Sequence, residues 1–133
     1  MINNGLLVEE HTGRLILIQV GPTFPDSARL FGPQLRQWEP IIERIADFFL
    51  RMRGQDAEIA ATVHFASQRL LERMTDATEN DVLHAVMMWK QRRKPPLGDG
   101  DVAQSIRNLN LMGWISVMPS KDLPLAQPDP LLV

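Results

Sequence analysis

Apolar residues recur at helical spacing through much of the second half of the chain. Residues 79–112 contain two such stretches, on either side of a connector rich in proline and glycine. Intervals of three and four residues place side chains on one face of an α-helix, so the pattern predicts a pair of amphipathic helices. The two apolar stripes are Val82, Val86 and Trp89 in the first helix, and Val102, Ile106 and Leu109 in the second.

The residues that flank these stripes are typical of helix ends. Thr78 is expected to cap the first helix, and Asp81, three residues later, can complete a capping box. Gly113 fits the left-handed position that ends the second helix. The next four residues, 114–117, favour an extended strand because they are rich in aromatic and β-branched side chains. A helix pair followed directly by a strand predicts the end of a winged helix-turn-helix.

The N-terminal part of the chain predicts a β-hairpin. Residues 6–10 and 14–20 form two extended segments around a short loop that contains Gly13. Residues 15–18 are a continuous apolar run and show no alternation with polar residues. Such a run is typical of a strand that is covered on both faces or lies at the edge of the core.

Helices are predicted between the hairpin and the helix pair. Residues 24–26 are expected to form a turn, and residues 28–31 a short helix. Pro40 is placed at the first position of a longer helix, where its missing N–H costs nothing, and the apolar stripe of that helix continues to Met52. Residues 56–74 repeat apolar side chains at three- and four-residue intervals, which predicts a core helix.

Together these elements predict one α+β domain over residues 1–133. The expected domain is mainly helical and winged-helix-like, with a small antiparallel sheet that includes the N-terminal hairpin. Because residues 123–126 make a poor returning strand, the hairpin is expected to pair with residues 114–117 instead. A proline-rich tail begins at about residue 119, and its last ten residues are expected to be loosely held.

Composition narrows the class of protein. The 133 residues are 44% hydrophobic, which is enough for a core, and the net charge is −2. That charge does not favour duplex DNA binding by bulk attraction to phosphate. The chain contains no cysteine and no apolar run of membrane-spanning length, so we expect a soluble cytoplasmic protein without disulfides.

The candidate chemistry of the chain favours binding over catalysis. His11 lies in a predicted turn, and His64 and His84 are interpreted as structural residues of helices. Neither a metal-ligand spacing nor a nucleophile–base arrangement stands out, and the glycines at 98 and 100 are interpreted as connector. We therefore expect no enzyme activity, no metal, no cofactor and no small-molecule substrate.

Two polar groups are candidates for contact with a partner. A basic run at the end of the first helix of the pair fits phosphate or an acidic partner, although a solvated helix end would also explain it. The polar face of the second helix carries side chains of the types that read base edges. The candidate contact residues are Lys90, Arg92, Arg93, Lys94, Asp99, Asp101, Arg107 and Asn108.

Three short motifs point to a known family. They are A-T-V-H-aromatic at residues 61–65, A-x-x-x-W-x-x-R-x-K at residues 85–94, and L-x-x-x-G-W at residues 109–114. With these motifs, residues 41–116 resemble the C-terminal domain of DarG-type antitoxins. In that family this domain binds and neutralises the toxin DarT, a DNA ADP-ribosyltransferase, while a separate macro domain removes ADP-ribose from DNA. The present chain contains no macro domain, so the resemblance does not imply hydrolase activity.

The resemblance implies a non-catalytic module that neutralises a toxin by direct contact. The chain departs from the family pattern at two places. Phe65 stands where the family often has tryptophan, and Pro95-Pro96 makes the connector between the two helices more rigid.

A DNA-binding toxin has a basic cleft, so a blocker should present carboxylates to it. The residues expected to act as this DNA mimic are Asp99 and Asp101, with Asp76, Glu79 and Asp81 across the preceding break, although helix capping alone would also explain most of them. The alternative is a winged-helix DNA-binding regulator that places residues 90–94 and Arg107 on phosphate. A third class, a small enzyme or a structural subunit, would hold His64 and His84 in a cleft.

Overall fold

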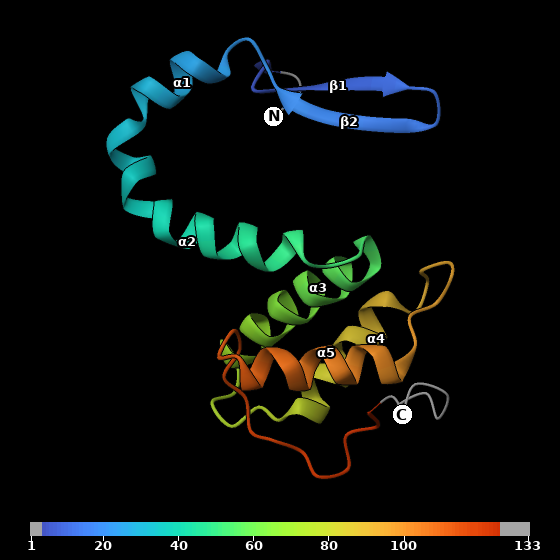
Figure 1. Ribbon diagram of the computed structural model, residues 1–133. Helices are drawn as coiled ribbons and strands as arrows, with labels where there is room; N and C mark the ends of the chain where they lie inside the picture. Colours follow the sequence, from blue (N-terminus) through green and yellow to red (C-terminus); the bar gives the residue numbers. More distant parts are fainter. Residues whose placement is uncertain (1–3, 126–133) are drawn as a thin grey trace. The chain divides into compact units, whose positions relative to one another are not determined.

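The computed structural model describes residues 4–125 (Figure 1). Over these residues it contains five α-helices and one two-stranded antiparallel sheet, which confirms the prediction of a mainly helical α+β fold with an N-terminal hairpin. The sequence predicted one domain, and the backbone contacts group the chain into two compact units that meet between Leu50 and Arg51.

The first unit begins with the predicted hairpin. Strands β1 (Leu7–Thr12) and β2 (Leu15–Val20) pair in a register that runs from Leu7 opposite Val20 to Thr12 opposite Leu15. Gly13 lies in the connecting turn with a φ of 63°, a conformation that glycine adopts without strain.

Two helices complete the first unit. Helix α1 (Phe24–Leu30) includes residues 24–26, so the turn predicted there is wrong: Pro25 is compatible with a first helical turn, where its missing N–H has no partner to lose. Helix α2 (Gly32–Leu50) contains Pro40 in its interior. The predicted start at Pro40 is therefore wrong, since the helix continues through the proline although one carbonyl loses its helical donor.

The second unit is built from three helices that contact one another in pairs (Figure 1). They are α3 (Gly54–Leu71), α4 (Glu79–Lys90) and α5 (Asp99–Leu111). Most residues of the predicted apolar stripes form its core, but Leu70 and Met74 are only partly buried and Trp89 is 56% exposed. The stripe residues that are buried include Ile59, Val63, Ala66, Val82, Val86, Val102, Ile106 and Leu109.

The segment after α5 departs from the predicted strand. Gly113 ends the helix with a φ of 72°, as predicted, but residues 114–117 form no strand, and the described sheet contains β1 and β2 alone. The predicted pairing of the hairpin with residues 114–117 is therefore wrong. The side chain of Asn110 explains the difference, because it accepts from the Val117 N–H at 3.3 Å and donates to the Val117 carbonyl at 3.0 Å. These are the bonds that a partner strand would otherwise supply.

Backbone pairing in this segment occurs one residue later. The Met118 N–H donates to the Ala77 carbonyl at 2.8 Å, and the Glu79 N–H donates to the Met118 carbonyl at 2.9 Å. Ser120 and Leu123 are buried, so the chain stays packed beyond residue 119. The rest of the predicted tail, residues 126–133, lies outside the described residues. Within those residues, every helix is too short or too polar to cross a bilayer.

Candidate partner-binding surface

A buried carboxylate organises the second unit. The side chain of Glu79 is fully buried, so its predicted place among the carboxylates of a DNA mimic is wrong. Arg107 donates to it through two hydrogen bonds of 2.8 Å each. The Ser120 N–H donates to the same carboxylate at 2.8 Å, and Asn110 donates at 3.2 Å. Burial by itself would raise the pKa of Glu79, but these bonds outweigh it and the pKa is lowered.

Within this cluster Arg107 has a structural role. Its guanidinium also donates to the Ser120 carbonyl at 2.7 Å, so it joins α4, α5 and the segment after α5. Three N–H donors of the guanidinium therefore already make hydrogen bonds within the chain. The sequence predicts a solvent-facing Arg107, because Glu79 lies 28 residues earlier and only the fold brings it beside Arg107.

The basic run at the end of α4 is also partly neutralised. Arg93 donates to the two carboxylate oxygens of Glu58 at 2.8 and 2.7 Å, and Lys90 donates to the same side chain at 3.3 Å. The hydrogen bond from Arg93 is the main reason why the pKa of Glu58 is lowered to about 2. Arg92 and Lys94 are exposed, so the run brings together two paired cations and two that face solvent.

Beside the basic run lies an exposed aromatic pair. The rings of Phe65 on α3 and Trp89 on α4 have centroids 5.4 Å apart and are tilted by 41°. Each residue is about half exposed, at 49% and 56%. The Arg69 guanidinium lies 5.5 Å from the Phe65 ring centroid, and the Lys90 ammonium lies 5.3 Å from that of Trp89. These contacts fall within the range of cation–π interactions.

The aromatic pair borders a surface cavity of about 280 Å³, whose rim also includes Arg69 and Arg73. We call Phe65, Arg69, Arg73 and Trp89 the aromatic–arginine surface. The sequence did not predict this surface, because helical spacing places Trp89 in the core. The available signal was that Phe65 and Trp89 are the aromatic positions of two separate motifs, which the fold brings into contact.

The acidic candidates lie at the start of α5. Gly98 is the N-cap and no side chain makes a capping hydrogen bond, so the prediction that Asp99 or Asp101 caps this helix is wrong. Both aspartates occupy the first turn, where their charge interacts favourably with the helix dipole, and both are exposed. Asn108, also exposed, accepts a hydrogen bond from Gln104 at 3.0 Å.

The histidines are not part of the core. His64 and His84 are exposed residues of α3 and α4, and His11 is exposed on β1. Among residues 4–125, no group of three or more histidine, aspartate or glutamate side chains is arranged to hold a metal ion.

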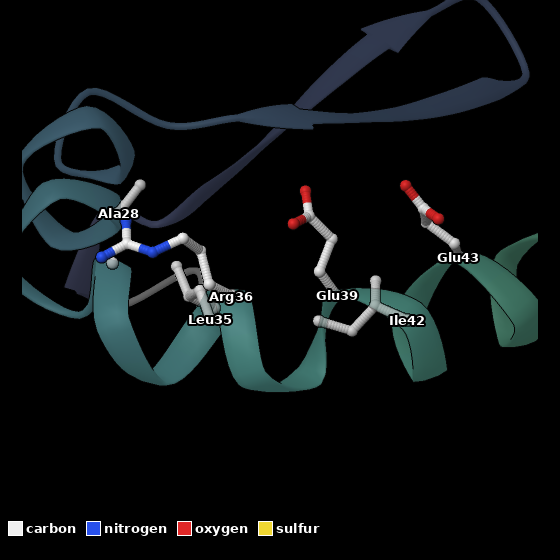
Figure 2. Close-up of a pocket in the computed structure, with 7 residues that line it drawn as sticks. Ala28, Leu35, Arg36, Glu39, Ile42 and Glu43 are labelled. Atoms are coloured by element: carbon white, nitrogen blue, oxygen red, sulfur yellow. The ribbon is translucent and has the colours of Figure 1, made fainter.

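The first unit carries a second hollow, of about 390 Å³, that sequence analysis did not single out. Figure 2 shows Glu39 and Glu43 extending from the same side of α2, with Arg36 and the apolar Leu35 and Ile42 nearby. Two like charges four residues apart slightly destabilise a helix. The residues that line the hollow carry a net charge of −1, from two glutamates and one arginine, and include the apolar Leu35 and Ile42.

Comparison of the chain with protein-family models, with curated proteins and with solved structures finds no match. The function of the chain is therefore inferred from the geometry of its surfaces.

Proposed function

We propose that the second unit is a non-catalytic protein-binding module of the antitoxin type, which neutralises a DarT-type DNA ADP-ribosyltransferase by direct contact. The observation that carries the proposal is the aromatic–arginine surface. Tryptophan, other aromatic residues and arginine are the residues most enriched where interfaces gain their binding energy. Phe65 and Trp89 already contact each other across two packed helices, so little conformational entropy is lost when a partner covers them.

The pairing of the basic side chains favours a protein partner over duplex DNA. Phosphate binding gains free energy when unpaired cations release the counterions of DNA. Lys90 and Arg93 share Glu58, and Arg107 is held by Glu79, so two carboxylates offset two of these three positive charges. The alternative function, a DNA-binding regulator, would depend mainly on Arg92, Lys94 and the one charge that Glu58 leaves uncompensated.

The two aspartates support the DNA-mimic part of the proposal. Asp99 and Asp101 are exposed and make no capping bond, so their carboxylates can face the basic cleft of an enzyme that binds DNA. Attraction between such surfaces accelerates encounter and weakens as salt is added. Replacing both aspartates by lysine is expected to weaken toxin binding and to make it less dependent on salt.

The test is a binding titration of the whole chain against the purified toxin. Trp89→Ala is expected to weaken binding at least 30-fold, as truncation of a central interface tryptophan costs about 2 kcal/mol or more. Trp38→Ala is the matched control, because Trp38 on α2 is 54% exposed against 56% for Trp89. Equal affinity of Trp89→Ala and the wild type would contradict the proposal, as would micromolar, salt-steep binding to a DNA duplex without toxin binding.

A further inference from the structure

The first unit exposes most of its apolar side chains. Among the described residues, fifteen of the 22 exposed large hydrophobic side chains lie between Val8 and Leu50. None of the residues of β1, β2, α1 or α2 is buried. An isolated two-stranded hairpin is marginally stable in water, and three or more strands or a covering helix are usually needed. The hairpin is therefore expected to need a further strand or a covering helix for its stability.

The two edges of the hairpin differ in charge. Strand β1 carries Glu9 and Glu10 followed by His11, whereas β2 contains no charged residue. Proteins protect free strand edges against pairing with other chains by placing charges on them. The outer edge of β1 has this protection, and the outer edge of β2, which is unpaired within residues 4–125, does not.

The register identifies the backbone groups at the unprotected edge. The Gly21 N–H donates to the Leu6 carbonyl at 2.8 Å, which makes these two residues a bonded pair. Residue pairs that exchange backbone hydrogen bonds alternate along an antiparallel ladder with pairs that do not. The pairs His11–Ile16, Glu9–Ile18 and Leu7–Val20 are therefore non-bonded. It follows that the N–H and C=O groups of Ile16, Ile18 and Val20 point away from β1.

We propose that β2 pairs with β2 of a second copy of this chain, antiparallel and around a two-fold axis at Ile18. A two-fold axis perpendicular to a sheet requires opposed residues to lie on the same face, which the alternate residues 16, 18 and 20 satisfy. Ile18 then faces Ile18 of the second copy, and Ile16 faces Val20. Each of these pairs joins β-branched side chains, which are favourable cross-strand neighbours. The result is a four-stranded sheet with a charged β1 at each edge.

Such a dimer gives the apolar edge strand of the first unit a partner. Five of the fifteen exposed side chains, Leu15, Ile16, Leu17, Ile18 and Val20, lie on β2. The outward N–H and C=O groups of β2 also gain hydrogen-bond partners in this pairing. This inference concerns the first unit and does not depend on the toxin-binding proposal.

Disulfide formation tests the register directly, because the chain contains no cysteine. Ile18→Cys is expected to form a disulfide-linked dimer under mild oxidation, since the Cα atoms of a bonded pair lie about 5.5 Å apart and disulfides span about 4.4–6.8 Å. Ile16→Cys is the matched control, with 57% exposure against 56% for Ile18. Its copies would lie roughly 13 Å apart and stay unlinked. A mixture of Ile16→Cys and Val20→Cys is expected to link.

Proline substitutions test whether the outer edge of β2 forms the dimer in a chain without introduced cysteines. Light scattering of the wild-type chain is expected to give a dimer, and Ile18→Pro a monomer, because the lost N–H points to the second copy and away from β1. Glu9→Pro, in the opposing residue of the same pair, is expected to remain dimeric. A monomeric wild type, a dimeric Ile18→Pro variant, or equal cross-linking of Ile16→Cys and Ile18→Cys would each overturn the proposal. If a proline variant does not fold, disulfide cross-linking of the conservative cysteine variants still tests the proposed pairing.

Discussion

Replacement of Glu79 by glutamine removes a charge from the centre of the second unit while it preserves the volume of the side chain. The carboxylate is fully buried and accepts from Arg107, Asn110 and the Ser120 N–H. Glutamine has one acceptor oxygen, and its amide N–H₂ group would face donors that need an acceptor. The substitution therefore removes the ion pair and leaves donors without a partner.

The structure sets the size of the effect. Removal of one partner from a buried ion pair costs about 3–5 kcal/mol, because the other charge is left uncompensated. The Arg107 side chain keeps 27% exposure, so water recovers part of the loss and the lower end of the range applies. For a unit of about 80 residues, about 3 kcal/mol corresponds to a fall in Tm of roughly 15 °C.

Thermal and urea unfolding followed by far-ultraviolet circular dichroism measures this change. Glu58→Gln is the matched control, since Glu58 also binds an arginine through two hydrogen bonds but its side chain is 34% exposed. Its effect on Tm is expected to be less than half that of Glu79→Gln. If the free energy of unfolding of Glu79→Gln lies within about 0.5 kcal/mol of that of the wild type, the structural role given to this cluster is refuted.

Three further outcomes follow from single contacts. The folded pKa of Glu58, about 2, lies below its ordinary value, so its ion pair should stabilise fully above about pH 4.5 and lose this effect as the pH falls towards 2; Glu58→Gln should flatten the dependence of Tm on pH over that window. Thr78→Ala removes the observed capping box and should cost about 1 kcal/mol in urea unfolding, whereas Thr78→Ser should cost far less. Gly113→Ala should cost about 1–2 kcal/mol from backbone strain alone, because φ is 72° and a Cβ would meet no neighbour; an unchanged Tm would contradict this.

The sequence predicted the elements whose signals are local. The intervals between apolar residues identified the buried faces of α3, α4 and α5, and Thr78 with Asp81 predicted a capping box that the structure contains. The hairpin was also predicted, because a short loop containing Gly13 separates two apolar segments. Each of these features depends on residues within one or two turns of one another.

Features that depend on distant residues were not predicted. Propensity favoured a strand at residues 114–117, but the Asn110 side chain and burial of Ile115 and Val117 hold this segment against the helices. Helical spacing placed Trp89 in the core, although the smaller Val82 and Val86 fill it. The partners of Arg107 and Arg93 lie 28 and 35 residues away, a separation that periodicity does not report.

The measurement that tests the proposed function most directly is growth of cells that express the DarT-type toxin together with this chain. The account predicts that the wild type and Trp38→Ala restore growth, and that Trp89→Ala does not, at equal levels of folded protein. Failure of the wild type to restore growth, or equal rescue by Trp89→Ala, would contradict the assignment of toxin binding to the aromatic–arginine surface.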